Sequence, residues 1–491
     1  MKRIALLALA GILGLTLAAC GDGNDDMDAG TDGGDAGSEM EDSGSDEPDA
    51  FVPDAGPMGC QEDCEVEQLS LGILHSCALR ANGEVICWGR AQELQLGDNR
   101  TRHEQCAEVG SDPEDCSGVP VNVRYEGESG LPVLMDATQI STRGFGASCA
   151  LRAGGELWCW SLETIPEVAG GMPRQRPVAE RDLATLDSVE QVSASDGHIC
   201  VVHGTDRRVL CAGSNSFGQL GLGTFGARVT MPTEVSLPDG DLTDVQQVEV
   251  SHGAFTCART SDTIYCWGVN DNDQFGDGVD TSHAAEPCMG SSVTDVFDCS
   301  NEAVEVGEIQ IDETTSEPLG PVSAMTLGSS HVCVVRSADG SPGQVYCWGD
   351  NRGGQGAQPD SEDSLGYPTA VDGIDDAVDV AAGSGFTCAL HDGGTISCWG
   401  SNLHGQLGDG VMDHGATCER GSDDVDCSRT PVSVETIDDA IAIGANASHA
   451  CAIRANGSVW CWGRNNNKQL GTTDRMNRYE PVMVQGTDPS M

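Results

Sequence analysis

Cysteine is the residue type with the clearest chemistry in this chain, because its 23 cysteines recur in close pairs. Two of them flank a turn within residues 75–89, where Asn82-Gly83 separates two apolar runs. Asn-Gly between strand-like runs is a strong hairpin signal, because the turn needs positive φ angles. Cys77 and Cys87 lie equally far from Asn82, so they face each other across the two strands. Partners in an antiparallel pair lie close enough for a disulfide. The stretch therefore predicts a hairpin closed by its own disulfide.

The remaining cysteines pair in the same local way. Seven pairs lie in hairpin stretches, three in insertions, and one at the start of the folded part. The hairpin pairs are Cys77 with Cys87, Cys149 with Cys159, Cys200 with Cys211, Cys257 with Cys266, Cys333 with Cys347, Cys388 with Cys398, and Cys451 with Cys461. The others are Cys106 with Cys116, Cys288 with Cys299, Cys418 with Cys427, and Cys60 with Cys64. Zinc binding is the alternative, but spacings near ten residues without paired C-x-x-C motifs do not fit a tetrahedral site. No metal site is therefore assigned.

Histidine and tryptophan also recur, and the repetition favours packing over catalysis. The recurring histidines are His75, His198, His331 and His449, and other copies carry Phe255, Phe386 and Ala147 at the same position. A position that accepts His, Phe and Ala is predicted to pack. The same holds for the repeated tryptophans Trp88, Trp267, Trp348, Trp399 and Trp462. The chain has no P-loop, no G-x-S-x-G and no H-E-x-x-H motif. No catalytic residue is assigned, and we do not expect an enzyme.

The first residues have the composition of a secretory signal. Lys2 and Arg3 precede an apolar stretch, residues 4–19, that ends in small residues. The ending Leu17-Ala18-Ala19-Cys20 resembles the lipobox of bacterial lipoproteins, which implies cleavage before Cys20 and lipidation of that residue. An ordinary secretory signal with a chance cysteine is the alternative. We expect an exported protein, anchored by lipid at the outer membrane on its periplasmic or cell-surface side. Disulfides persist in such oxidising compartments.

Residues 21–59 differ in composition from the rest of the chain. They contain 13 Asp and Glu, no Lys or Arg, and much Gly, Ser, Ala and Pro. Such a segment buries too little apolar surface to offset the entropy of ordering, so we expect a disordered tether. Calcium binding at residues 25–28 and 32–35 is an alternative, although the spacing differs from an EF-hand loop. No other cofactor is expected.

The elements that position the cysteines form a repeat, because the hairpin recurs seven times with first cysteines 51 to 76 residues apart. This spacing suits an array of supersecondary repeats. A strand-like run precedes each hairpin, at residues 66–71, 137–141, 189–193, 245–250, 322–327, 377–381 and 440–443. A short strand opened by proline follows most hairpins, at residues 120–123, 177–178, 232–235, 368–371 and 431–434. Alternating polarity predicts strands with one buried face, and the prolines favour edge positions.

The repeat resembles that of the regulator of chromosome condensation family. The residues that carry the resemblance follow the patterns G-x-x-H-[ST]-x-A-L, x-G-x-[VI]-x-x-W-G and N-x-x-G-Q-L-G, over about residues 65 to 487. The resemblance implies an all-β, seven-bladed β-propeller with four strands per blade. Copy two lacks G-Q-L-G, and copy three has Ala212 in place of the tryptophan. We expect a lipoprotein signal peptide at 1–19, the lipidated Cys20 with the tether at 20–59, and the propeller at 60–491.

The ends of the chain raise the question of ring closure. The first copy has no proline-opened strand before it, whereas residues 480–484, with Pro481, lie beyond the last hairpin. We expect this C-terminal strand to pair into the first blade and close the ring, which leaves only protected edges.

Three cysteine-closed insertions, at residues 102–118, 284–305 and 415–429, are the parts that the repeat does not share. All follow the same turn, so we expect them near one face. Their acidic residues are the candidate binding residues: Asp112, Glu114, Asp115, Asp295, Asp298, Asp423, Asp424 and Asp426. A closed loop is pre-organised, which lowers the ordering cost of binding. The alternative is that these loops are stabilised and solvated without a partner.

The formal net charge of −53 bears on the partner. Phosphate backbones would be repelled, so no nucleic acid partner is expected, while a basic protein surface fits. Our main hypothesis is a monomeric, envelope-anchored propeller that binds a protein as a scaffold, adhesin or inhibitor. Guanine-nucleotide exchange, implied by the family resemblance, is one alternative. A carbohydrate-active enzyme with its site in the propeller channel is the other.

Overall fold

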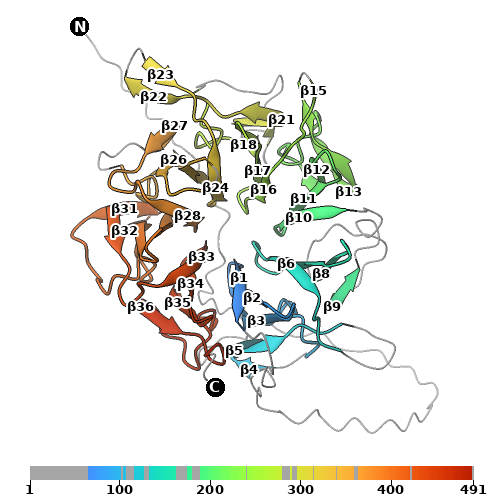
Figure 1. The fold of residues 1–491 in the computed structure, drawn as a ribbon, viewed down its shortest axis with the longest axis vertical. Coiled ribbons are helices and arrows are strands. Elements are labelled where there is room, and N and C mark those ends of the chain that lie inside the picture. The colour runs from blue at the N-terminus through green and yellow to red at the C-terminus, as the bar shows by residue number, and fades with distance from the viewer. Residues whose placement is uncertain are drawn as a thin grey trace, which may run out of the picture.

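Seven antiparallel sheets stand around a common axis in the computed structural model, each forming one blade of a propeller (Figure 1). The structure describes residues 65–100, 103–106, 115–125, 132–161, 174–179, 188–238, 240–278, 288–289, 296–312, 315–338, 340–358, 363–420 and 423–488. The predicted all-β, seven-bladed fold is confirmed. Within these ranges, no helix is long and apolar enough to cross a membrane. Cys20 and the tether lie outside the described residues.

Each blade has four main strands, which run outward from the axis in chain order. The innermost strands of blades 1 to 7 are β1 (Val66–Leu71), β6 (Ala137–Ser141), β10 (Val189–Ala194), β16 (Gln247–Val250), β24 (Val322–Leu327), β28 (Ala377–Ala382) and β33 (Ala440–Asn446). The second strands are β2 (His75–Arg80), β7 (Ser148–Arg152), β11 (His198–His203), β17 (Phe255–Arg259), β25 (His331–Arg336), β29 (Phe386–His391) and β34 (His449–Arg454). The third strands are β3 (Val85–Arg90), β8 (Leu157–Ser161), β12 (Arg208–Asn215), β18 (Ile264–Val269), β26 (Gln344–Asp350), β30 (Ile396–Ser401) and β35 (Val459–Gly463).

The outer strands are β5 (Asp115–Asn122), β9 (Arg174–Ala179), β13 (Gly226–Glu234), β21 (Cys299–Glu305), β27 (Ser364–Ala370), β32 (Asp423–Ser433) and β36 (Arg478–Met483). Short strands extend two blades, β4 (Glu104–Gln105) in blade 1 and β31 (Thr417–Arg420) in blade 6. Three small ribbons pair β14 (Ser236–Leu237) with β15 (Gly240–Asp241), β19 (Cys288–Met289) with β20 (Val296–Phe297), and β22 (Ile309–Asp312) with β23 (Thr315–Glu317).

The hairpin register is the one that the turn predicts. Cys77 lies opposite Cys87 and Leu79 opposite Val85. The other six hairpins have the same arrangement, with Cys149 opposite Cys159, Cys200 opposite Cys211, Cys257 opposite Cys266, Cys333 opposite Cys347, Cys388 opposite Cys398, and Cys451 opposite Cys461. Cysteines opposite each other need no backbone movement to bond, so these disulfides are a consequence of the strand register.

Ten of the eleven predicted cysteine pairs are disulfides in the structure. They comprise all seven hairpin pairs and the three insertion pairs, Cys106 with Cys116, Cys288 with Cys299, and Cys418 with Cys427. The eleventh pair, Cys60 with Cys64, lies outside the described residues, so its disulfide stays a prediction.

The core of the protein lies between neighbouring blades. One cluster joins Phe255 and Ile264 of blade 4 to Val332, Val334 and Trp348 of blade 5. The repeated tryptophans are all buried in such clusters, between the adjacent sheets that Figure 1 shows. Each blade has apolar residues on both faces, so no blade can bury its core without its neighbours. This is why the ring has to close.

The ring closes differently from the prediction, which was wrong. The C-terminal strand β36 pairs with β35, with Cys461 opposite Val482, so it is the outer strand of blade 7. Blade 1 has its own outer strand, β5. Each proline-opened strand completes the repeat that it follows, and therefore no strand is spare at the C-terminus.

Side chains close the ring instead. Blades 1 and 7 share an apolar cluster that includes Val66 and Trp88 from one and Ile453 and Val484 from the other. The indole Nε1 of Trp88 donates to the backbone oxygen of Gln469 at 2.9 Å. The first and last blades therefore meet through the same kind of contact as the other blades.

The strand order also places the insertions. In blade 1, His75 at the start of β2 lies opposite Gly89 near the end of β3, and Leu71 at the end of β1 lies opposite Ser76. The β1–β2 loop and the insertion after β3 therefore leave the blade at the same end. Because all blades share this pattern, the three insertions lie on the same side of the ring as the loops around the axis. We call this side the insertion face.

Candidate binding face

The predicted acidic residues of the insertions fall into two groups. Asp115, Asp298 and Asp426 stand directly before the second cysteine of each insertion, and these cysteines lie in the outer strands β5, β21 and β32. Asp112, Glu114 and Asp295 lie outside the described residues. Asp424 is exposed on β32, and Asp423 starts that strand. The first group lies at the base of the insertions, where the chain returns to the blade.

Asp115 is held by a histidine that the repeat patterns do not single out. His103 Nδ1 lies 2.9 Å from Asp115 Oδ2, and His103 Nε2 lies 3.0 Å from Asp98 Oδ2. The backbone N–H of His103 also donates to Asp115 Oδ1. A ring that bonds carboxylates through both nitrogens has to donate from both, so it is an imidazolium. We call this Asp–His–Asp arrangement the latch.

The latch recurs in the insertion of blade 6. His414 Nδ1 lies 2.8 Å from Asp426 Oδ2 and His414 Nε2 lies 2.8 Å from Asp409 Oδ2, and the His414 N–H donates to Asp426. Asn402 Nδ2 also donates to Asp426. In blade 4 Asn270, at the position of Asn402, makes the equivalent bond, because its Nδ2 donates to Asp298 Oδ2 at 2.7 Å. The aspartates before the second cysteines thus join the insertions to the blades.

The electrostatics of the latch follow from burial and charge. Burial alone would lower the pKa of His103, but the hydrogen bonds and negative charges of Asp115 and Asp98 outweigh it and raise the pKa to about 10. The same balance raises the pKa of His414. Burial would raise the pKa of Asp426, but the hydrogen bonds from His414 and Asn402 hold it below its usual value. The His103 ring is therefore protonated at neutral pH.

A spacing in the sequence would have revealed the latch. Both insertions have an aspartate five residues before the histidine and another directly before the second cysteine. The sequence prediction treats all carboxylates of the insertions as equivalent, so it does not distinguish Asp115 and Asp426 from the exposed Asp424.

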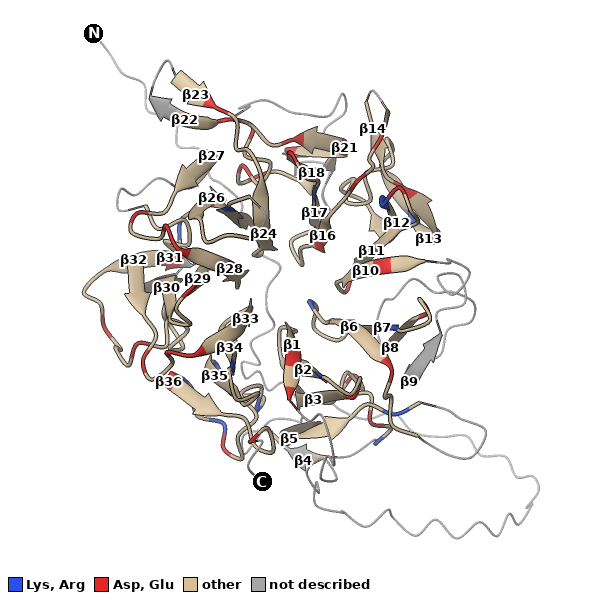
Figure 2. Cartoon of the chain, viewed as in Figure 1, with Lys and Arg blue, Asp and Glu red and all other residues tan. Residues whose placement is uncertain are grey.

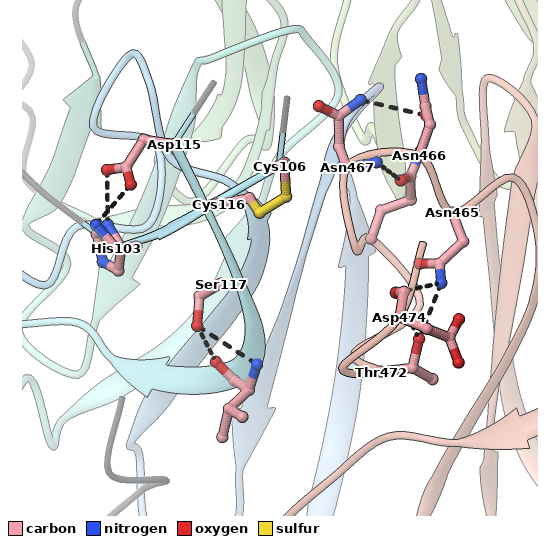
Figure 3. Close-up of a disulfide and its surroundings, with 12 residues drawn as sticks. His103, Cys106, Asp115, Cys116, Ser117, Asn465, Asn466, Asn467, Thr472 and Asp474 are labelled. Atoms are coloured by element: carbon pink, nitrogen blue, oxygen red, sulfur yellow. Dashed lines mark hydrogen bonds and ion pairs between the residues drawn. A yellow bond between two sulfur atoms is a disulfide. The ribbon is translucent and has the colours of Figure 1, made fainter. Parts of the chain in front are cut away.

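Each insertion also packs against the turn of the preceding blade. Figure 3 shows the Cys106–Cys116 disulfide with His103 and Asp115 on one side and the turn 465–467 of blade 7 on the other. A Cβ at Gly118 would lie 2.2 Å from the Thr472 oxygen of blade 7. In blade 6, Glu419 N donates to Arg352 O of blade 5 at 3.1 Å. The bases of the insertions therefore have a structural role.

The repeated histidines connect neighbouring blades, as predicted for a packing position. His198 Nε2 lies 2.8 Å from Thr256 Oγ1 in the next blade, and Thr256 Oγ1 donates to Gln219 O, so the hydroxyl accepts from the ring. His75, His331 and His449 make the same contact to Ser148, Thr387 and Ser76. Burial lowers the pKa of His198 to about 3. Such a neutral ring is buried between two blades.

The tryptophans form a second set of contacts between blades. In the preceding blade, the turn with the sequence G-Q-L-G or a variant of it contains a glutamine. Each repeated indole Nε1 donates to the backbone oxygen of that glutamine, at 2.8–2.9 Å. Two copies depart from this pattern, and both departures affect the same contact. Copy two lacks the glutamine turn, and copy three has Ala212 where a tryptophan would donate to that turn. The two departures in the sequence thus amount to one missing contact.

Arg143 spans the axis on the insertion face. Its guanidinium Nη1 donates to Leu327 O of blade 5 at 2.8 Å, and Nη2 contacts the Glu249 carboxylate of blade 4. Asn446 Nδ2 of blade 7 donates to Leu71 O and to Arg143 O. Burial, with the negative charge of Glu249, raises the pKa of nearby Asp379 to about 7. This end of the channel is therefore crossed by a charged side chain that is already paired.

Charge is distributed over the whole ring. Figure 2 shows Asp and Glu on every blade and only scattered Lys and Arg. Among the residues that the structure describes, no group of three or more His, Cys, Asp and Glu has an arrangement that could hold a metal ion. The surface presents dispersed negative charge, which favours cationic partners in general.

Comparison with known families agrees with this geometry. Two models, both described as "Regulator of chromosome condensation (RCC1) repeat", match the chain. One matches residues 66–95, 189–219, 322–355, 377–406 and 440–469. The other matches residues 206–258, 342–390 and 456–489. The ranges of the first model run from the inner strand to the glutamine of the turn in blades 1, 3, 5, 6 and 7. Blade 2 and most of the blade 4 hairpin lie outside both sets of matches.

The chain is also similar to curated proteins and solved structures. It is 24% identical to the ultraviolet-B receptor UVR8 of Arabidopsis thaliana over 428 residues, 85% of this chain and 81% of UVR8. It is 25% identical to the human E3 ubiquitin-protein ligase HERC2 over 68% of this chain, but spans only 6% of HERC2. Prp20p of Saccharomyces cerevisiae matches with a TM-score of 0.57 at 15% identity, over 87% of this chain and 89% of Prp20p. Human WBSCR16 also matches with a TM-score of 0.57, at 17% identity, over 82% of this chain and 94% of WBSCR16.

Proposed function

Because this chain is a seven-bladed β-propeller with regulator of chromosome condensation (RCC1) repeats, we propose that it is a protein-binding module whose insertion face holds the partner. Relatives of the same fold bind proteins. The structure of Prp20p was described with its binding to Gsp1p and histones, and yeast RCC1 was solved bound to Kap60. The role as scaffold, adhesin or inhibitor depends on the partner.

The observation that supports this function most directly is the construction of the insertions. Disulfides close them, and the latches of His103 and His414 tie two of them to their blades. A loop held at its base loses little conformational entropy when a partner binds its tip. The repeat itself does not require these insertions, since four of the seven copies lack them.

The same proposal includes a place for the protein in the cell. The sequence supports export by residues 1–19, lipidation at Cys20, and a tether up to residue 59 that separates the propeller from the outer membrane. Ten disulfides in the described part suit an oxidising compartment. The membrane is then contacted through the lipid alone.

Affinity capture from the envelope and secreted fractions of the producing cell tests this function. The test variant neutralises four insertion carboxylates outside the latches: Asp112→Asn, Glu114→Gln, Asp295→Asn and Asp424→Asn. The control variant neutralises four carboxylates in turns and connectors on the opposite face: Asp262→Asn, Asp372→Asn, Asp375→Asn and Asp392→Asn. We expect one protein, identified by mass spectrometry and then purified, to bind wild type and control but to bind the test variant more weakly.

Equal binding of that protein to both variants would show that the neutralised insertion carboxylates do not contribute to binding. Capture of glycan alone would contradict protein binding and favour the carbohydrate-active alternative. Binding of a guanine-nucleotide-binding protein, with accelerated nucleotide release, would favour the exchange-factor alternative instead.

A further inference from the structure

Half of the large apolar side chains exposed in the described residues gather over one pair of blades. Eight such residues are exposed in all, and four of them belong to loops of blades 6 and 7 on the insertion face. Their exposed fractions are 45% for Leu403, 41% for Val411, 70% for Met412 and 67% for Met476. We call these four residues the apolar patch.

Backbone and side-chain contacts hold the loops of the apolar patch together. Asn402 Nδ2 donates to Val411 O at 2.9 Å, which joins the turn of Leu403 to the loop of Val411 and Met412. Gly410 N donates to Tyr479 O at 2.8 Å. His404 Nδ1 lies 3.3 Å from Asn477 Nδ2, next to Met476. Four apolar side chains from three loops therefore share one surface across the seam between the two blades.

The repeat does not require apolar residues at these positions. The other copies carry polar or charged residues where blade 6 has Leu403, namely Gln92, Ser216, Asp271, Arg352 and Asn466. The insertion of blade 1 has the same latch as blade 6, and there Arg100 and Thr101 stand at the positions of Val411 and Met412. Residues that the fold does not need, and that are costly to expose, indicate an interaction.

The apolar patch is also held in place. His414 of the latch follows Met412 by two residues and is fixed at both ring nitrogens by Asp409 and Asp426. The disulfide Cys418–Cys427 closes the same insertion. The backbone that presents Val411 and Met412 is therefore pre-organised, while the methionine side chains themselves remain adaptable.

The charges around the apolar patch select the partner. Asp413, next to Met412, and Glu480 are exposed, and a Cβ at Gly410 would lie 3.0 Å from the Glu480 carboxylate. Of the nearby cations, Arg478 is paired with Asp474, and Arg475 stands directly before Met476. An apolar centre with an acidic surround complements a segment that carries apolar side chains flanked by lysine or arginine.

We propose that the apolar patch docks a basic, amphipathic segment of a partner protein. This inference rests on the proposed binding function and makes it more specific, since it names the docking residues and the chemistry of the partner. Apolar contacts in the centre supply the affinity, and the acidic surround supplies orientation and association rate.

Synthetic peptides of defined composition test the proposal with the purified, oxidised full chain. One peptide alternates Lys with Leu, one alternates Lys with Ser, and one alternates Glu with Leu. The test variant is Leu403→Asn with Met412→Thr, which borrows the residues that blades 7 and 1 carry at these positions. The control is Met231→Thr on β13 of blade 3, where the side chain is 53% exposed.

We expect the Lys–Leu peptide to bind wild type and the control equally and to bind the test variant about tenfold more weakly, as measured by fluorescence anisotropy. The Lys–Ser and Glu–Leu peptides should bind wild type more weakly than the Lys–Leu peptide does. Equal affinity of wild type and test variant for the Lys–Leu peptide would overturn the proposal, and so would an equal loss in the Met231→Thr control.

Two other occupants of the apolar patch would also overturn it. Sedimentation would show wild type as a dimer and the test variant as a monomer if a second copy covers the surface. Phe51 is an aromatic residue of the tether. If a Phe51→Ser variant binds the peptide more tightly than wild type, the tether covers the apolar patch. The cellular partner can bind the variant with neutralised insertion carboxylates more weakly than its control and still bind the Leu403→Asn, Met412→Thr variant as tightly as wild type. In that case this inference fails and the proposed binding function stands.

Discussion

At the scale of single residues, the contact between two blades depends on a pair of positions in adjacent copies. Where one copy has a buried histidine, the next copy has Ser or Thr, as in His331 and Thr387. Where one copy has Phe or Ala, the next has an apolar residue, as in Phe255 and Val332. This correspondence holds around the ring, because a buried hydroxyl needs a hydrogen-bonding partner and a buried apolar side chain does not.

A double-mutant cycle tests this pairing. His331→Phe removes the ring that bonds Thr387 and should lower the free energy of unfolding by about 1–2 kcal/mol. Thr387→Val in the same chain recreates the combination of Phe255 and Val332 in blades 4 and 5, so the double variant should regain part of the loss. The measurement is denaturant unfolding under non-reducing conditions. Strictly additive losses would contradict the pairing.

The latch predicts a pH dependence at the same scale. The folded-state pKa of His103, about 10, lies above the unfolded value near 6.5. Its stabilisation is therefore complete below pH 6.5 and is lost as the pH rises through 10. The protection factors of the β5 amides, which correct for base-catalysed intrinsic exchange, should fall over this range in wild type. His103→Gln should lower the protection factors at pH 7 and abolish their alkaline fall, whereas an unchanged alkaline profile of protection factors would rule out the latch.

The acid side follows from Asp426, whose pKa is lowered in the folded state. Its contribution is present above its unfolded pKa and is lost as the pH falls through the folded one. The insertions should therefore be most firmly held near neutral pH.

At the scale of the element, the unit is a hairpin with a disulfide and a glycine. Gly463 follows Trp462 at a φ of 98°, and a Cβ there would lie 2.5 Å from Ser448 O. The glycine allows the third strand to bulge, which shifts its register toward the outer strand. Gly89, Gly268, Gly349 and Gly400 occupy the same position. The glycine that follows the tryptophan in these five repeats is thus explained by local backbone geometry.

Removing one hairpin disulfide tests how much the element depends on it. Cys451→Ala with Cys461→Ala opens a loop with a sequence separation of 10 residues, which should cost about 2–3 kcal/mol. The blade should still form, because the strand register and the cluster shared with blade 1 remain. Thermal unfolding followed by circular dichroism gives the loss. Removing Cys418 and Cys427 instead should loosen the insertion and change the global transition less. Loss of the whole fold would contradict this expectation.

At the scale of the whole molecule, the ring has one seam that differs from the others. Between blades 2 and 3, Ala147 and Ile199 replace the histidine and hydroxyl, and Ala212 replaces the tryptophan. Another residue supplies polar contacts there, because the Asp196 carboxylate of blade 3 accepts from the N–H groups of residues 145 to 147 in blade 2. This seam lacks both the histidine and the tryptophan contact, whereas the seams between blades 4 and 5 and between blades 6 and 7 lack the histidine contact but keep the tryptophan contact.

Asp196→Ala should therefore open the ring at this seam. Three N–H groups lose a charged acceptor, which should cost about 2–3 kcal/mol. Amide hydrogens of β7 and β10 should exchange faster, while those of β25 and β29 change little. Asp262→Ala, at an exposed turn, is the control and should leave exchange unchanged. Uniform acceleration in all blades would contradict a local opening.

Much of the fold was predictable from the sequence, and the reason is that each repeat encodes its own hairpin locally. Apolar alternation, the Asn82-Gly83 turn and the cysteine spacing predict the strands and the register that pairs Cys77 with Cys87. The inner strands β1, β6 and β24 have the predicted bounds. These features depend on residues within about fifteen positions of each other, where chain geometry alone decides which side chains meet.

The tertiary structure decided the features that join distant residues. Sequence alone did not show that β36 belongs to blade 7, because the residues of a short outer strand do not specify which strand it pairs with. It did not separate Asp426, bonded to His414, from the exposed Asp424 two residues earlier. It did not predict that Arg143 reaches across the axis to Leu327. Such contacts depend on the positions of whole blades around the ring. Those positions are set by the packing of all seven blades against one another.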